Sequence, residues 1–148
     1  MKKILFAFTI LLSSFCGGAQ KAKDSIAIKK LLEKEADTWR SGDVKAHADC
    51  WSVQPYSRIL VSTADGNCYD VPPENVISPP AGTMGKGGHA VLGNYTFSIQ
   101  KKYAWVSHDE VSVAADGNKT YSHEIRLLEK IKGQWKLVGQ SIHIYKPG

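Results

Sequence analysis

Residues 121–138 read YSHEIRLLEKIKGQWKLV, which is two strand-like runs joined by a short turn at Lys132-Gly133. Together with two similar runs before them, the strand-like segments are residues 94–100, 103–113, 120–131 and 134–145. The turns at residues 101–102 and 116–118 are also short enough for antiparallel hairpins. The pattern therefore predicts a four-stranded meander, and a meander of this length needs another element to cover its apolar face.

The cover for this sheet is predicted near the front of the chain. Asp24 or Ser25 can cap a helix that runs to about Arg40, and Gly42 is a natural terminator. Apolar residues recur in this stretch at the spacing of one helical stripe: Ile28, Leu31, Leu32, Ala36 and Trp39. Asp43 can cap a shorter second helix whose apolar positions are Val44, Ala48 and Trp51.

Between the helices and the meander, residues 57–63 and 68–71 read as strands around the turn Asp65-Gly66-Asn67. Residues 74–78 can form one helical turn, and the proline- and glycine-rich residues 79–93 read as a long loop. The whole pattern predicts an α+β fold, with helices packed on a curved sheet and a pocket between the two layers.

The first 19 residues have the features of an export signal. Lys2 and Lys3 precede an apolar run, and Gly17-Gly18-Ala19 supplies small residues for cleavage. The apolar run is too short to span a bilayer. We therefore expect an exported protein, periplasmic or secreted, with one domain at residues 20–148 and no membrane association after cleavage. Phe15 disfavours lipidation at Cys16, because a lipidation signal needs a small residue there.

The charge pattern and the cysteines bear on two further properties, nucleic-acid binding and disulfide formation. The chain carries 19 Lys and Arg against 14 Asp and Glu, and these residues alternate along the sequence. We therefore expect no nucleic-acid partner. Cys50 and Cys68 could form a disulfide in an oxidising compartment, closing a loop of about 19 residues and adding roughly 3 kcal/mol. Two free thiols, one of them buried at a helix end, are the alternative.

Several of these segments resemble NTF2-like domains. The helix, Gly42-Asp43, the short helix ending in Trp51, and Arg58-Ile59-Leu60-Val61 resemble the opening of that family. Residues 104–107, 124–127 and 133–136 resemble its closing strands. Exported SnoaL-like or DUF4440-type bacterial proteins are the most similar subgroups, and the association domain of calcium/calmodulin-dependent kinase II has similar closing strands. Residues 79–93 depart from the family, which usually has a helix there.

The resemblance and the composition disagree about which face of the strand at residues 120–131 is buried. Tyr121, His123, Ile125 and Leu127 form its more apolar face, so composition alone places Glu124 and Arg126 in water. In the kinase association domain, by contrast, the arginine of a similar E-x-R pattern points into the cone. The resemblance therefore implies a ligand-binding position at Arg126, with Glu124 nearby. Trp105 and Ser107 share one face of the neighbouring strand and are further candidates, and Trp51 and Tyr56 could form aromatic walls of the pocket.

Catalysis would need a base in that pocket. Enzymes of this fold use an Asp or an Asp–His pair for proton transfer, so Asp109 and His123 are the candidate catalytic residues, with Asp49 also available. A surface ion pair across the strands is the alternative role for Asp109. The five histidines fall on separate segments without a ligand motif, so we expect no metal and no cofactor.

Three functions remain open from the sequence. The domain could bind a small, partly apolar or anionic molecule in its cone. It could instead catalyse proton transfer, isomerisation or dehydration, or serve as a non-catalytic assembly module. We also expect a homodimer, because a curved sheet with one face turned away from the helices often pairs through that face.

Overall fold

The computed structural model describes the backbone of residues 5–148 and the side chains from residue 18 onward. The side chains that define the predicted leader, including Cys16, lie outside the described residues, so export and cleavage stay predictions. Among the described residues, no helix has the length and apolar content needed to cross a bilayer.

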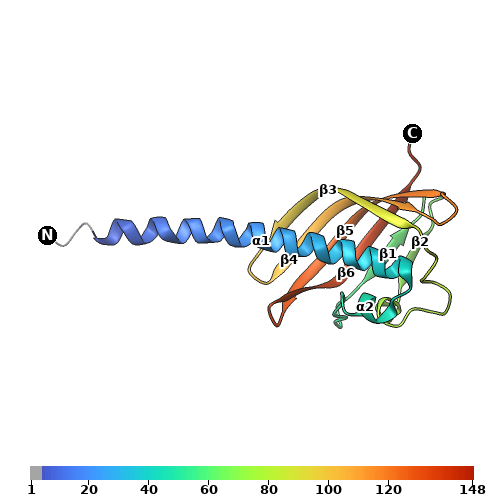
Figure 1. Cartoon of the computed structure of the whole chain (residues 1–148), viewed down its shortest axis with the longest axis horizontal. Helices are drawn as coiled ribbons and strands as arrows, with labels where there is room; N and C mark the ends of the chain where they lie inside the picture. The colour runs from blue at the N-terminus through green and yellow to red at the C-terminus, as the bar shows by residue number, and fades with distance from the viewer. Residues whose placement is uncertain (1–4) are drawn as a thin grey trace.

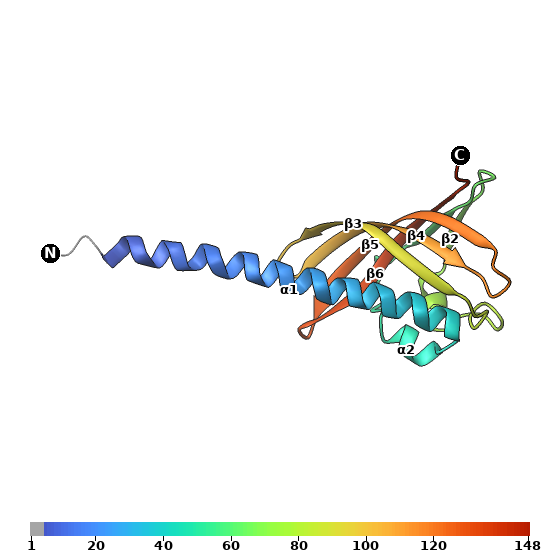
Figure 2. The same ribbon diagram turned by 45° about the horizontal axis from the view of Figure 1, so that its top comes forward.

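The chain forms one mixed sheet with two helices on one face. The elements are α1 (Leu5–Ser41), α2 (Val44–Ala48), β1 (Ile59–Ser62), β2 (Cys68–Val71), the 3-10 helix η1 (Pro73–Val76), β3 (His89–Ile99), β4 (Tyr103–Val113), β5 (Lys119–Ile131) and β6 (Gln134–Tyr145). The strand order is β2-β1-β6-β5-β4-β3, and only the β1–β6 pair is parallel. Helix α1 lies across the curved sheet in both views (Figures 1 and 2). This is the α+β architecture that the sequence predicts.

Helix α1 buries one stripe against the sheet. Ile28, Leu32 and Ala36 are almost completely buried along it, as the spacing predicts. Asp24 corrects the predicted start of the helix, because it lies inside α1 rather than at its cap. Its carboxylate accepts hydrogen bonds from Lys130 Nζ at 2.6 Å and Trp135 Nε1 at 2.9 Å. Asp24 thus joins the helix to the β5–β6 hairpin.

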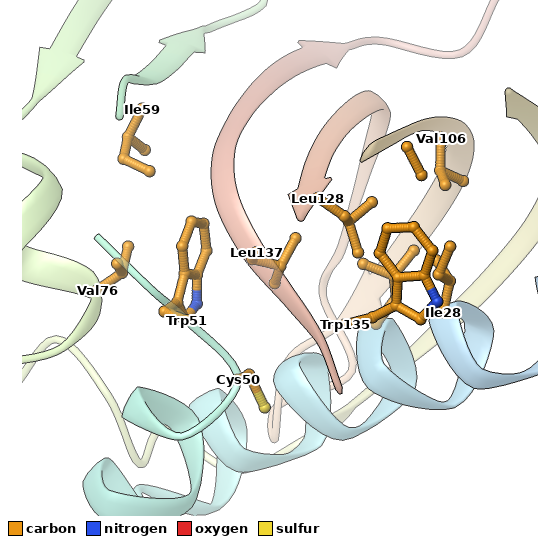
Figure 3. Packing of buried hydrophobic residues seen from close by; sticks show 11 residues of the cluster. Ile28, Cys50, Trp51, Ile59, Val76, Val106, Leu128, Trp135 and Leu137 are labelled. Carbon is orange, nitrogen blue, oxygen red and sulfur yellow. The ribbon is translucent and has the colours of Figure 1, made fainter. Parts of the chain in front are cut away.

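The hydrophobic core lies between the helices and the strands β4, β5 and β6. Trp51 and Leu137 form an isolated parallel bridge, so Trp51 follows α2 instead of ending it as predicted. Figure 3 shows the Trp51 ring beside Val76 and Leu137, while Trp135 lies next to Ile28 of α1. Val44 is exposed, against expectation, and His47 is the buried residue of α2.

Strand β3 begins earlier than the sequence suggests. Residues 89–93 were expected in a loop, yet they pair with β4, from His89 opposite Val113 to Gly93 opposite Asp109. Gly88 makes this pairing possible, because its φ is +81° and a Cβ there would lie 2.0 Å from the Val113 carbonyl oxygen. Of the predicted loop at residues 79–93, only residues 79–88 therefore lie outside helices and strands.

The two cysteines of the domain are free thiols, so the disulfide considered from the sequence is not formed. Cys50 is fully buried after α2, and its thiol donates to the Ala46 carbonyl at 3.3 Å. Cys68 is exposed at the start of β2. Burial raises the pKa of Cys50 to about 11, which keeps this thiol protonated and unreactive at neutral pH.

Candidate functional site

A cavity of about 420 Å³ lies between the helices and the sheet. It has an apolar wall, formed by Ala36, Trp39, Ile59, Val61, Val71, Val76, Ile142 and Ile144. Its polar lining consists of Glu35, Arg40, His47, Asn75, Glu110, Ser112, Thr120, Ser122, Glu124, Arg126 and Gln140. The size and the mixture of apolar wall and convergent polar groups suit a small-molecule site.

Strand β5 supplies the centre of the polar lining. Ser122, Glu124 and Arg126 are buried, whereas His123, Ile125 and Leu127 are exposed. The inward face is therefore the one implied by the NTF2-like resemblance, and the inference from composition is wrong. The resemblance places the arginine correctly, but its proposed role in binding a ligand stays a prediction.

Arg126 is held by several acceptors although only 4% of its surface is exposed. Its guanidinium forms ion pairs with Glu124 and, at 3.6 Å, with Glu35. It also donates to the Gln140 side-chain oxygen and to His108 Nε2, the latter at 3.4 Å. A buried guanidinium needs such partners, because an isolated charge in the protein interior is strongly unfavourable.

A second buried ion pair joins α1 to β4. Arg40 Nη2 lies 2.6 Å from Glu110 Oε1 and 2.7 Å from Ser112 Oγ. Burial, followed by the nearby charge of Glu124, raises the pKa of Glu110, and the two arginines only partly offset this effect. Glu110 is therefore a carboxyl group that can hold a proton closer to neutral pH than an exposed glutamate.

His47 and His108 are the buried histidines beside this lining. His108 Nε2 lies 3.8 Å from Glu124, and burial, together with the charge of Arg126, lowers the pKa of His108. His108 is therefore neutral at neutral pH. His47 lines the cavity from α2, and its Nε2 lies 3.7 Å from Glu35 Oε1.

Four predicted site residues lie on the opposite face of the sheet. Trp105, Ser107 and Asp109 of β4, and His123 of β5, point away from the helices. The register explains this correction, because directly opposed residues share a face: His108 pairs with Glu124 and Val106 with Arg126. The even-numbered residues of β4 therefore face the helices, and two of them, Glu110 and Ser112, line the cavity, whereas the odd-numbered ones do not.

On that outer face, Asp109 and His123 do interact, but as a surface pair. His123 Nδ1 lies 2.7 Å from Asp109 Oδ1, and Asn94 Nδ2 donates to Asp109 Oδ2 at 2.7 Å. The hydrogen bond from Asn94, and then that from His123, lowers the pKa of Asp109. A carboxylate stabilised in this way is a weak base, so the structure supports the surface-pair alternative rather than catalysis in the cone.

The two remaining residues predicted for the pocket wall, Trp51 and Tyr56, do not line the cavity either. Trp51 is buried in the hydrophobic core and is not part of the cavity lining. Tyr56 is 63% exposed and donates its hydroxyl to Glu129. Sequence reasoning missed Glu35, Arg40, Glu110 and Gln140, although Glu35 lies directly beside Ala36 on the predicted helical stripe.

The part of the chain with described side chains contains no group of three His, Cys, Asp or Glu residues that could hold a metal ion. The buried carboxyl groups are paired mainly with arginine. The polar lining of the cavity offers groups for hydrogen bonding, ion pairing and proton transfer, next to a large apolar surface.

Neither a protein-family model nor a curated protein matches the sequence. Solved structures do match its fold. An NTF2-like protein with a cystatin-like fold from Novosphingobium aromaticivorans aligns with a TM-score of 0.69 at 15% identity, covering 93% of this chain and 92% of that chain. An NTF2-like protein of unknown function from Shewanella baltica aligns with a TM-score of 0.63 at 17% identity, covering 85% of this chain and 97% of that chain.

A putative calcium/calmodulin-dependent kinase II association domain from Exiguobacterium sibiricum also aligns, with a TM-score of 0.60 at 11% identity, covering 84% of this chain and 95% of that chain. Identities at this level show the fold alone. The chain therefore has the NTF2-like fold that the sequence predicts.

Proposed function

We propose that this NTF2-like domain binds a small, partly apolar molecule in its cone-shaped pocket. The observation that carries the proposal is the cavity of about 420 Å³, with an aliphatic wall on one side and buried charged groups on the other. Burying such charges is unfavourable for folding alone, and their position around an open cavity supports a role in recognition.

The charge of the lining bears on the kind of ligand. Three carboxyl groups, Glu35, Glu110 and Glu124, line the cavity with only two guanidinium groups. Arg126, the residue expected to anchor an anion, is already paired with Glu124. An anionic ligand would have to compete with that carboxylate, so neutral and cationic molecules suit the pocket better.

Proton-transfer catalysis is the second candidate, and Glu110 is the observation that favours it. A buried carboxyl group with a raised pKa at the edge of a cavity has the properties of a general acid or base. Glu110, and not Asp109 or His123, would then carry the reaction. Glu110→Gln should then abolish turnover.

The outer face of the sheet supports our proposal of a homodimer. Tyr103, Trp105, Ile125 and Leu127 are large, exposed and adjacent on β4 and β5. We also propose, from the sequence features alone, that the protein is exported to the periplasm or secreted and that it belongs to the SnoaL-like or DUF4440-type subgroup.

Binding can be tested with a set of probes that share one apolar body. Naphthylmethylamine, naphthylmethanol, methylnaphthalene and naphthoate differ only in the charge and hydrogen bonding of their head group. Trp39 lines the cavity, whereas the other three tryptophans do not, so its indole N–H signal in NMR spectra reports on occupancy. Trp39→Phe assigns that signal.

A matched pair of variants on β1 locates the binding. Val61 lines the cavity, and Leu60 points to the other face of the sheet. We expect methylnaphthalene and the amine to shift the Trp39 signal in the wild type and in Leu60→Phe, but not in Val61→Phe, which fills the cavity. If no probe binds, or if Val61→Phe binds as well as the wild type, the proposal is wrong.

A further inference from the structure

His47 has an unusual environment for a buried polar residue. Only 1% of its surface is exposed, and it lines the cavity from the short helix α2. Its Nε2 has no hydrogen-bond partner among the described residues. A buried polar atom without a partner is costly, so this nitrogen calls for a partner that the described residues do not supply.

The hydrogen bonds of the other ring nitrogen determine what that partner must be. His47 Nδ1 lies 3.1 Å from the Glu35 carbonyl oxygen, which can only accept, so Nδ1 must carry the proton. Thr38 Oγ1 lies 3.4 Å from Nδ1, and two backbone carbonyls are closer acceptors for its single proton, that of Lys34 at 2.8 Å and that of Glu35 at 3.0 Å. In the neutral ring, Nε2 is therefore a bare acceptor.

Glu35 places a second acceptor beside this nitrogen. Its Oε1 lies 3.7 Å from His47 Nε2, and its Oε2 lies 3.6 Å from Arg126 Nη1. Both separations exceed a hydrogen bond, so the carboxylate is held electrostatically and retains free acceptor positions. Two acceptors thus face the same end of the cavity, and neither receives a hydrogen bond from the other.

From this geometry we infer that His47 Nε2 and the Glu35 carboxylate bind a hydrogen-bond-donating head group, best a protonated primary amine. The apolar body of the same ligand lies against the apolar wall of the cavity. This inference rests on the proposed binding function and adds the ligand class. An ammonium has three N–H donors and can reach both acceptors, whereas a hydroxyl has one.

The first test needs no ligand. The nitrogen-15 shifts of the His47 ring in the wild-type domain at neutral pH should show a protonated Nδ1 and an unprotonated Nε2. Naphthylmethylamine should then change the Nε2 shift more than the Nδ1 shift. A ring protonated on Nε2 would overturn the inference, because that nitrogen could no longer accept.

The second test compares the probes with two substitutions of His47. In the wild type, we expect naphthylmethylamine to bind more tightly than naphthylmethanol, and both to bind more tightly than methylnaphthalene. His47→Asn keeps a donor near the position of Nδ1 and removes Nε2, so it should weaken binding of the amine roughly tenfold and leave methylnaphthalene unchanged. His47→Gln carries its amide near the Nε2 position and should recover part of the loss. His123→Asn, on the outer face, is the matched control.

The outcomes separate this inference from the proposed function. If methylnaphthalene and the amine bind equally well, and His47→Asn binds both like the wild type, the cavity is a binding site but His47 and Glu35 do not select the ligand. If no probe binds the wild type, the proposed function itself fails. Preferred binding of naphthoate would also overturn the inference, because it would make the pocket an anion site.

Discussion

Arg126 shows how single residues decide the character of this pocket. Its guanidinium compensates the buried carboxylates of Glu124 and Glu35 at once. We expect Arg126→Met to lower the free energy of unfolding by about 3–5 kcal/mol, because it leaves these carboxylates buried without a counter-charge. Urea denaturation measures the change.

Arg58 provides the control for that substitution. It pairs with Asp70 on the exposed side of β1 and β2. Arg58→Met should leave the denaturation midpoint almost unchanged, whereas an equally small effect of Arg126→Met would show that the buried ion pairs contribute little to folding.

The residue scale also shows where sequence reasoning fails. Strand alternation correctly groups Ser122 with Glu124 and Arg126, because the two faces of a strand are fixed by geometry. Alternation cannot say which face is buried, and it cannot give the register between strands. Asp109 and Glu110 are neighbours in sequence, yet only Glu110 reaches the cavity, because it pairs with Ser122.

At the level of elements, Asp24 fastens α1 to the β5–β6 hairpin. Burial acts to raise the pKa of the Asp24 carboxyl group. The hydrogen bonds from Lys130, Trp135 and Gln20 outweigh burial and lower this pKa below its usual value of 3.8. Because the pKa of Asp24 is lower in the folded than in the unfolded state, its carboxylate stabilises the fold fully at pH values above the unfolded-state pKa. This stabilisation is lost as the pH falls through the folded-state pKa. The wild type should therefore be more stable than Asp24→Asn at pH 7, and this difference should shrink below about pH 4. Thermal unfolding of both proteins across pH tests this, and a constant difference would contradict it.

Strand β3 offers a second prediction at this level. Gly88 and Gly66 both have positive φ, but a Cβ at Gly66 meets nothing within 4 Å, whereas one at Gly88 would collide with the backbone of β4. Gly66→Ala should lower the free energy of unfolding by about 1 kcal/mol. Gly88→Ala should lower it clearly more, because only this substitution also disrupts the β3–β4 pairing. Hydrogen exchange of the β3 amides measures the local effect, and equal losses in both variants would rule out the collision.

The elements themselves were largely predictable from the sequence. The bounds of β4 and β6 match the predicted runs, because short turns with Gly117 and Gly133 delimit them. Two features were not predictable from local pattern. Residues 89–93 become a strand only through pairing with β4, and Trp51 leaves the predicted helix to bridge Leu137. Both depend on contacts between distant segments.

For the whole molecule, the proposed dimer follows from the apolar outer face of the sheet. Leu127 is 48% exposed and Trp105 43% exposed on adjacent strands. We expect light scattering to give twice the monomer mass, and Leu127→Glu to shift the protein to the monomer, because a charge there would be buried in the interface. Ile26→Glu, at an exposed position of α1, is the control. A monomeric wild type would exclude this interface.

The position of β6 has a consequence for how the chain reaches its folded state. Strand β6 lies in the middle of the sheet, between β1 and β5, although it follows β1–β5 in the chain. The early β1–β2 hairpin has no neighbouring strand to join until residues 140–143 of β6 have left the ribosome. Folding should therefore be a late, all-or-none event in the life of the nascent chain.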